Sequence, residues 1–186
     1  MEKYPHYLER LQNATRKYWE KSALNSIGGE SFTYGQMATQ IEKFHLVFEK
    51  LGVKKGDKIA LHARNGARWG MTYLAVNTYE AIIVPILADF TPDSASFLTN
   101  HSESIILFTN EDKWKKMDPS KTPLLRLVID IDNWEAIYAA KPDDVIPLGE
   151  NGCVMVVADG MGGMNAGEVA SELAVKGIRR SFEEVS

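Results

Sequence analysis

The sequence predicts an α/β protein built on a mostly parallel sheet with helices on both faces. Two observations support this fold class. Short, nearly continuous apolar runs are typical of strands buried on both faces, because no polar residue interrupts them. Segments with helical spacing of apolar residues separate these runs, and strands that alternate with helices favour parallel pairing. The predicted strands lie at residues 59–61, 81–86, 104–108 and 125–129.

The first part of the chain predicts two helices with a turn between them. Apolar residues at roughly helical intervals over residues 4–22 indicate an amphipathic helix that docks on the domain. Residues 27–32 are typical of a turn with short strands. Thr33, followed three residues later by Gln36, forms a capping-box pattern at the start of the second helix. Gly52 is expected to end that helix.

The middle of the chain continues the alternation of strands and helices. Residues 67–79 have a helical pattern, and residues 110–116 predict a short helix. Thr91 and Pro92 stand as N-cap and first residue of another helix that runs to about residue 101. Pro85 lies inside a strand pattern, so it implies a strand end or a backbone position without a pairing partner.

Composition limits the classes of function. The 186 residues carry a net charge of −4, with 45% hydrophobic and 25% charged residues. These are ordinary values for a globular protein and give no support to nucleic-acid binding. Cys153 is the one cysteine, so it is interpreted as a small buried hydrophobe. His45 has no second candidate ligand one helical turn away and is interpreted as a packing residue.

Two further expectations concern location and assembly. The sequence has no signal-peptide pattern and no apolar run of membrane-spanning length, so we expect no transmembrane segment and a cytoplasmic protein. An incomplete sheet leaves backbone groups unpaired at its edge, which favours association with a second copy. A homo-oligomer is therefore one of the expected partners.

Residues 154–171 carry the most specific chemical pattern. Apolar residues predict a strand that ends at Asp159, and the glycines that follow allow close approach of a ligand to the backbone. Asn165 is placed as the N-cap of a final helix. Because the first N–H groups of a helix favour negative charge, Gly162, Gly163 and Asn165 are candidates for an anion-binding site.

Sequence phrases between about residues 5 and 145 point to one family. These phrases are Phe32–Met37, Leu51–Ala60, Arg64-Asn65 with Trp69, Pro85, Thr91-Pro92, Ser102 before Ile105–Phe108, and Lys141–Val145. In order and spacing they resemble the amino-terminal region of adenylate-forming enzymes, and most of all bacterial long-chain fatty-acid CoA ligases. The resemblance implies acyl-adenylate formation from ATP and a fatty acid, with Mg²⁺, and then transfer to CoA in a complete ligase.

The family's glycine- and hydroxyl-rich phosphate-binding loop would begin shortly after residue 145. The sequence motif of this loop is absent here, and the chain continues instead into the glycine-rich segment around Asp159. Such a loop holds the triphosphate through its backbone amides. No residue of this sequence therefore inherits a catalytic role in adenylation, and the resemblance implies a scaffold.

The carboxyl-terminal phrases resemble a second family. Asp159-Gly-Met-Gly-Gly163, followed by Gly167-Glu168 and Ala170-Ser171, is similar to the signature of metal-dependent serine/threonine phosphatases, the protein phosphatase 2C family. This resemblance implies metal-ligand roles for Asp159 and Gly160, which suit Mg²⁺ or Mn²⁺. Asp144 stands at about the spacing of another metal-binding acid of that family, and its alternative reading is a solvated turn residue. So few protein ligands predict weak metal binding.

The two resemblances divide the chain at residue 146. Residues 1–146 are expected to form an incomplete acyl-CoA-synthetase subdomain, and residues 147–186 a phosphatase-like beginning whose strand at 153–159 joins the sheet. Three interpretations stay open: an inactive scaffold fused to a phosphatase-like segment, part of a working acyl-CoA synthetase, or a fragment of a metal-dependent phosphatase. We prefer the first, because the catalytic residues of both families are incomplete in this sequence.

Overall fold

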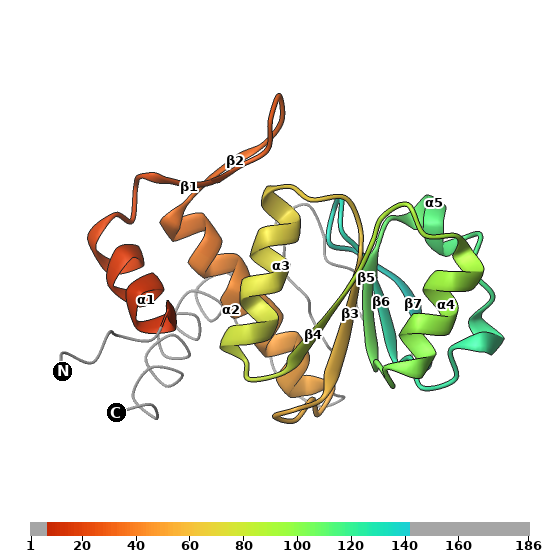
Figure 1. Cartoon of the computed structure of the whole chain (residues 1–186). Coiled ribbons are helices and arrows are strands. Elements are labelled where there is room, and N and C mark those ends of the chain that lie inside the picture. Colours follow the sequence, from red (N-terminus) through yellow and green to blue (C-terminus); the bar gives the residue numbers. More distant parts are fainter. Residues whose placement is uncertain (1–6, 142–186) are drawn as a thin grey trace, which may run out of the picture.

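The computed structural model describes residues 7–141. They form a layered α/β domain (Figure 1). Its helices are α1 (Tyr7–Lys17), α2 (Tyr34–Lys50), α3 (Ala67–Thr78), α4 (Pro92–His101), α5 (Glu111–Trp114) and the short 3₁₀ helix η1 (Pro119–Lys121). Its strands are β1 (Ser22–Asn25), β2 (Ser31–Thr33), β3 (Lys58–His62), β4 (Ile82–Ile86), β5 (Ile106–Thr109), β6 (Leu127–Asp130) and β7 (Ala136–Ala139).

The main sheet has five strands in the order β4-β3-β5-β6-β7. Strands β3, β4, β5 and β6 pair in parallel, and β7 pairs antiparallel with β6. The predicted mostly parallel α/β fold is confirmed. Strand β7 was not predicted from the sequence; it follows a tight turn at Trp134, where φ is +61°. Strands β1 and β2 form a separate antiparallel hairpin that projects from the body of the domain (Figure 1).

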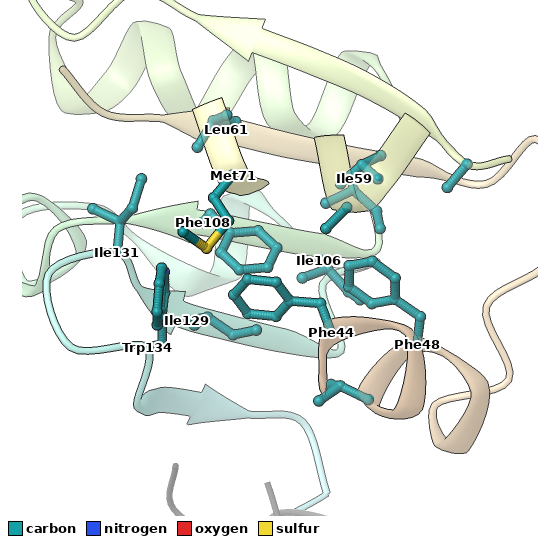
Figure 2. Packing of buried hydrophobic residues seen from close by; sticks show 14 of the residues in the cluster. Phe44, Phe48, Ile59, Leu61, Met71, Ile106, Phe108, Ile129, Ile131 and Trp134 are labelled. Carbon is teal, nitrogen blue, oxygen red and sulfur yellow. The ribbon is translucent and has the colours of Figure 1, made fainter. Parts of the chain in front are cut away.

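Helices cover both faces of the main sheet (Figure 1). The α2 face carries α2 and α3, with α1 against α2, and its core includes Phe44, Phe48 and Phe108 (Figure 2). The α4 face carries α4 and α5 and has a smaller core around Leu107 and Trp114. Alternate residues of the parallel strands supply the two cores, as expected for strands buried on both sides.

Local sequence signals explain where the helices begin and end. Thr33 Oγ1 accepts a hydrogen bond from Gln36 N at 3.2 Å, and Thr33 N donates to Gln36 Oε1 at 2.9 Å, so the predicted capping box is confirmed. Helix α2 ends before Gly52, whose φ of +65° is readily adopted by glycine. Thr91 caps α4, and Pro92 is its first residue, as predicted.

Two helix exits use a glutamate where glycine is more usual. Glu80 follows the last turn of α3 with φ +64°, and Glu103 follows the last turn of α4 with φ +58°. Both side chains form ion pairs at the surface, Glu80 with Lys55 and Glu103 with Lys58. The left-handed conformation lets the chain turn directly into the next strand at each position.

Three predictions are refined by the structure. Helix α1 ends at Lys17, before the predicted end at about residue 22, and has no buried residue, although Leu11 packs against the α2-face core. His45 is a packing residue, as predicted: its Nε2 lies 3.0 Å from Ala75 O and 2.9 Å from Thr78 Oγ1, so it ties α2 to α3. Among residues 7–141 no helix has both the length and the apolar character needed to cross a bilayer.

Pro85 lies on the outer edge of the main sheet. The N–H of Ile82 donates to Asp57 O on the β3 side, so by alternation Ile83 and Pro85 face away from β3. Pro85 therefore occupies a position that needs no hydrogen-bond donor within the sheet, which confirms the predicted unpaired backbone position.

Candidate functional site

The connections of the parallel strands create a crevice at one end of the sheet. The chain leaves β3 toward α3 on the α2 face, whereas it leaves β5 toward α5 on the α4 face. Strands β3 and β5 are neighbours, so their carboxyl ends diverge in opposite directions. Ligands of open α/β sheets bind outside the carboxyl ends of the strands at such a point.

A pocket lies at this position, with a volume of about 240 Å³. We call it the crevice. Its walls come from the hairpin, from the loop after β3 and the start of α3, and from the ends of β5 and β6. The lining residues are Ser26, Glu30, Ala63, Arg64, Gly66, Ala67, Arg68, Trp69, Asn110, Ile131 and Asp132.

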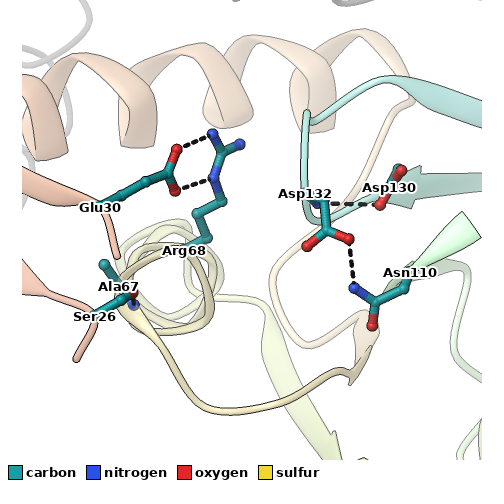
Figure 3. Close-up of polar contacts among 7 residues, drawn as sticks. All are labelled: Ser26, Glu30, Ala67, Arg68, Asn110, Asp130 and Asp132. Atoms are coloured by element: carbon teal, nitrogen blue, oxygen red, sulfur yellow. Dashed lines mark hydrogen bonds and ion pairs between the residues drawn. The ribbon is translucent and has the colours of Figure 1, made fainter. Parts of the chain in front are cut away.

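The hairpin is fixed to the start of α3 by two side-chain contacts (Figure 3). Gly66 is the N-cap of α3 and has no capping side chain, so Ser26 Oγ accepts the hydrogen bond from Ala67 N at 2.9 Å instead. Glu30 receives two hydrogen bonds from Arg68, both of 2.6 Å. These bonds lower the pKa of Glu30 below its usual value. Residues far apart in sequence thus form one wall of the crevice.

Arg68 is held from both sides. Its guanidinium carbon lies 4.4 Å from the centre of the Trp134 ring, in addition to the paired contact with Glu30. Flat stacking of an arginine on an aromatic ring adds a cation–π attraction. The charge of Arg68 is therefore neutralised within the domain, and the side chain acts as a structural clamp between α3, the hairpin and the turn before β7.

The opposite wall is acidic and polar (Figure 3). Asn110 Nδ2 donates to Asp132 Oδ2 at 2.8 Å, and Asp132 N donates to Asp130 Oδ1 at 3.0 Å. Burial raises the pKa of the Asp130 carboxyl, and the hydrogen bond from Asp132 N partly opposes that rise. Each of these residues sits at or just after the carboxyl end of a parallel strand.

Arg64 is the cation that stays available in the crevice. It is exposed, and no carboxylate of residues 7–141 lies within ion-pair distance of it. Together with the first N–H groups of α3, its charge favours an anionic group at this end of the sheet.

The crevice is nevertheless too small to enclose a nucleotide. Ligand pockets usually measure about 300–1,000 Å³, and the crevice is below that range. Among the described residues no group of three or more histidine, cysteine, aspartate or glutamate side chains is arranged to hold a metal ion. The residues present do not fit a complete ATP–Mg²⁺ site, so we derive no reaction step from them.

The residues predicted to bind metal or anion lie outside the described range. They are Asp144, Asp159, Gly160, Gly162, Gly163 and Asn165. The crevice residues were not singled out from the sequence as site residues, although Arg64 and Trp69 belong to the phrases that carry the ligase resemblance. One sequence signal could have identified the crevice: a polar residue, such as Asn110 or Asp132, closely follows an apolar run that predicts a strand.

Comparison with known protein families settles the relationship that the fold suggests. Residues 11–159 match the model of the family described as AMP-binding enzyme. The chain belongs to the AMP-binding enzyme family. The match extends beyond residue 146, while the domain boundary predicted there stays a prediction.

Curated relatives of this family member include CoA ligases. The crotonobetaine/carnitine–CoA ligase of Proteus mirabilis is 26% identical over 111 residues, which are 58% of this chain and 21% of the relative. The enzyme of the same name from Salmonella arizonae is 30% identical over 97 residues, covering 50% and 19%. The chain therefore spans about a fifth of the length of these relatives.

Solved structures share the fold. The anthranilate CoA ligase AuaEII, in complex with anthranoyl-AMP, superposes with a TM-score of 0.63 at 17% identity, covering 70% of this chain and 26% of that one. Coronafacic acid ligase from Pectobacterium brasiliense gives 0.62 at 18% identity, covering 80% and 28%. At this level of identity the likeness concerns the fold alone.

Proposed function

We propose that this chain forms the amino-terminal sheet of a ligase that activates a carboxylic acid with ATP and transfers the acyl group to CoA. The observation that carries the proposal is the AMP-binding family match over residues 11–159, together with curated relatives that are named as CoA ligases. ATP, Mg²⁺, CoA and an acyl substrate are the partners of such an enzyme.

The described residues serve this ligase as a scaffold. Arg68, Glu30 and Ser26 fix the hairpin over the carboxyl end of the sheet, which keeps one side of the crevice in a defined shape. Arg64 contributes positive charge there. The phosphate-binding groups belong to other segments, because the crevice is smaller than a nucleotide pocket. The 186-residue chain alone should therefore not turn over substrate.

A segment exchange tests this proposal. In the ligase of Proteus mirabilis, the 111 matched residues would be replaced by the matching residues of this chain, and we call the product the grafted ligase. We expect it to exchange pyrophosphate into ATP and to form the CoA thioester of the host substrate. A grafted ligase that melts cooperatively but does neither would show that this segment cannot serve as the sheet of a CoA ligase.

A core variant provides the control for the graft. Phe44 is completely buried, so Phe44→Asp would place an unpaired charge in the α2-face core. The grafted ligase with this substitution should lose both soluble yield and activity. Retained activity would mean that the host enzyme does not depend on the grafted sheet, and the test would then count against the proposal.

Long-chain fatty acids are the acyl substrates that we propose. The support comes from the sequence phrases shared with bacterial long-chain fatty-acid CoA ligases, such as Leu51–Ala60 and Thr91-Pro92. The polypeptide that contains this chain should form thioesters faster from palmitate than from crotonobetaine or anthranilate. A preference for either of the two small acids would contradict this part of the proposal.

A fragment of a metal-dependent phosphatase is the second candidate function, favoured by the sequence motif from Asp159 to Ser171. Asp159, Gly160 and Asp144 would supply oxygen ligands to Mg²⁺ or Mn²⁺. Manganese titrated into the chain by calorimetry should then give a weak signal that Asp159→Asn removes. A wild-type chain without any manganese signal would end this candidate. The domain boundary at residue 146, the cytoplasmic location and a homo-oligomer stay predictions from the sequence.

A further inference from the structure

Helix α4 buries only small residues against the sheet. Its buried residues are Ala95, Ser96 and Thr99, while Phe97 points away from the sheet with 65% of its surface exposed. The hydroxyl oxygens of Ser96 and Thr99 have no hydrogen-bond partner among the described residues. A surface helix normally turns its largest apolar side chains toward the core. In α4, Leu98 packs partly buried against the α4-face core, but Phe97, the largest apolar residue of the helix, stays exposed.

The exposed side of α4 continues into the loop before it. Leu87 and Phe90 in that loop are 68% and 42% exposed, and we call Leu87, Phe90 and Phe97 the α4 patch. A shallow hollow of about 430 Å³ lies between the loop and the helix. Its lining residues are Phe90, Asp93, Ser94, Phe97 and Leu98. Grouped exposed apolar side chains of this kind mark interaction surfaces.

The charges around the α4 patch indicate what kind of surface would cover it. Asp93 is the one charged residue that lines the hollow, and it forms an ion pair of 2.7 Å with Lys121. At the other end of α4, the imidazole of His101 stacks on the Phe97 ring with their centres 5.6 Å apart. The charge that lines the hollow is therefore paired within the domain. Such a patch selects an apolar, uncharged surface rather than a charged ligand.

Strand addition at the neighbouring edge is a poor alternative. Strand β4 is the edge strand of the main sheet on that side, and its outward positions are Ile83 and Pro85. Pro85 has no N–H, so the edge offers few donors to an incoming strand. A partner on this side of the domain must bind mainly through side chains.

We propose that the α4 patch is covered, in the complete enzyme, by polypeptide of the same AMP-binding ligase that lies outside this 186-residue chain. This inference rests on the proposed function. The chain corresponds to 21% of the Proteus mirabilis ligase and to 26% of the solved anthranilate ligase, so most of such an enzyme lies outside the matched segment and can supply a covering surface. The α2 face is already covered by α1, α2 and α3, whereas the α4 patch groups three exposed large apolar side chains on the opposite face, where further polypeptide can pack.

The first test uses the 186-residue chain itself. Phe97→Lys removes the centre of the patch, and Asn100→Lys places the same charge at an exposed polar position of the same helix. The wild-type chain should enhance the fluorescence of anilinonaphthalene sulfonate, Phe97→Lys should lose about half of that enhancement or more, and Asn100→Lys should keep it. A wild-type chain without dye enhancement would contradict an open apolar patch.

The second test compares the same variants in the grafted ligase. Phe97→Lys should lower soluble yield and pyrophosphate exchange by about tenfold, because a lysine would be buried against apolar protein, whereas Asn100→Lys should stay within about twofold of the unsubstituted graft. Equal behaviour of the two variants would overturn the inference. An unsubstituted graft that folds but is inactive would count against the proposed function, and the dye measurement would then decide on the patch.

A second copy of the chain is the competing occupant. Light scattering on the wild-type chain should give a monomer or a weak association that Asn100→Lys and Phe97→Lys do not distinguish. A stable dimer that Phe97→Lys alone converts to a monomer would show that the patch binds another copy, and the inference would be wrong.

Discussion

The two faces of the main sheet differ in how far they bury their large apolar side chains. On the α2 face, Phe44 packs edge-on against Phe108 and Trp134, with ring centres 5.2 and 5.6 Å apart, and it is fully buried (Figure 2). On the α4 face, Ala95, Ser96 and Thr99 are what α4 buries, while Phe97 stays exposed. The α2 face thus buries its large aromatic side chains within the domain. The α4 face leaves one exposed, where we infer that further protein packs.

The largest expected effect lies on the α2 face. Phe44→Ala should lower the free energy of unfolding by about 3–5 kcal/mol, because it removes a buried ring from an aromatic cluster. Leu107→Ala on the α4 face should cost less, about 2–3 kcal/mol, since the side chain is smaller and its core cluster has fewer buried members. Urea denaturation measures both. A larger loss for Leu107→Ala would reverse the comparison.

Acid should weaken the α2 face through His45. Burial lowers the pKa of His45 from 6.5 to about 4, so the unfolded chain binds a proton below pH 6.5 that the folded chain refuses until about pH 4. The stability linked to His45 is therefore complete above pH 6.5 and is lost as the pH falls toward 4, by up to about 3 kcal/mol.

A variant isolates this effect. His45→Gln has no titrating ring, so its free energy of unfolding should fall less between pH 7 and pH 4.5 than that of the wild-type chain. Glu42, whose pKa is raised to about 7 by burial, acts in the opposite direction equally in both chains. The control is His101→Gln on α4, whose side chain is exposed. Thermal melts at both pH values would provide the comparison, and equal slopes for His45→Gln and wild type would contradict the assignment.

The hydrogen bond that joins the hairpin to α3 should have a smaller effect on stability. Ser26→Ala removes the acceptor that caps α3 at Ala67 N, which should cost about 1 kcal/mol. Ser22→Ala changes an exposed hydroxyl in the same hairpin and should cost little. If the two variants had equal stabilities, the capping contact would have no energetic importance.

The smallest effect should come from the α4 patch. Phe97→Ser in the 186-residue chain should change the unfolding free energy by no more than about 0.5 kcal/mol, because the ring is already mostly in water. A loss as large as that of Leu107→Ala would mean that Phe97 belongs to the core of the domain, and the contrast between the two faces would disappear.

Local signals made most of the fold predictable. The capping box at Thr33 and the Thr91-Pro92 start of α4 depend on residues only a few positions apart, and both were correctly placed. The apolar runs located the parallel strands because burial on both faces leaves no polar residue inside them. Strand β7 was missed because Ala136–Ala139 is short, and the turn before it places Trp134 rather than glycine in the left-handed conformation, although Asp132 and Asn133 are turn residues.

The crevice could not be located in the same way. It joins Ser26 and Glu30 of the hairpin to Arg68, and Asn110 to Asp132, across dozens of residues. Such contacts follow from the strand order, which periodicity does not determine. The exposure of Phe97 could not be predicted for a similar reason: the sequence Ser-Ala-Ser-Phe-Leu-Thr shows a helix, but not which of its sides the sheet will cover.

The glutamates at the two helix exits have a practical consequence for engineering. Glu80 and Glu103 hold a backbone shape that costs little only for glycine, and what each gains in return is an ion pair in water, which contributes little. Replacing either with glycine would relieve the backbone without touching a core. Variants of this domain with a higher melting temperature can therefore be sought at these two exposed helix ends.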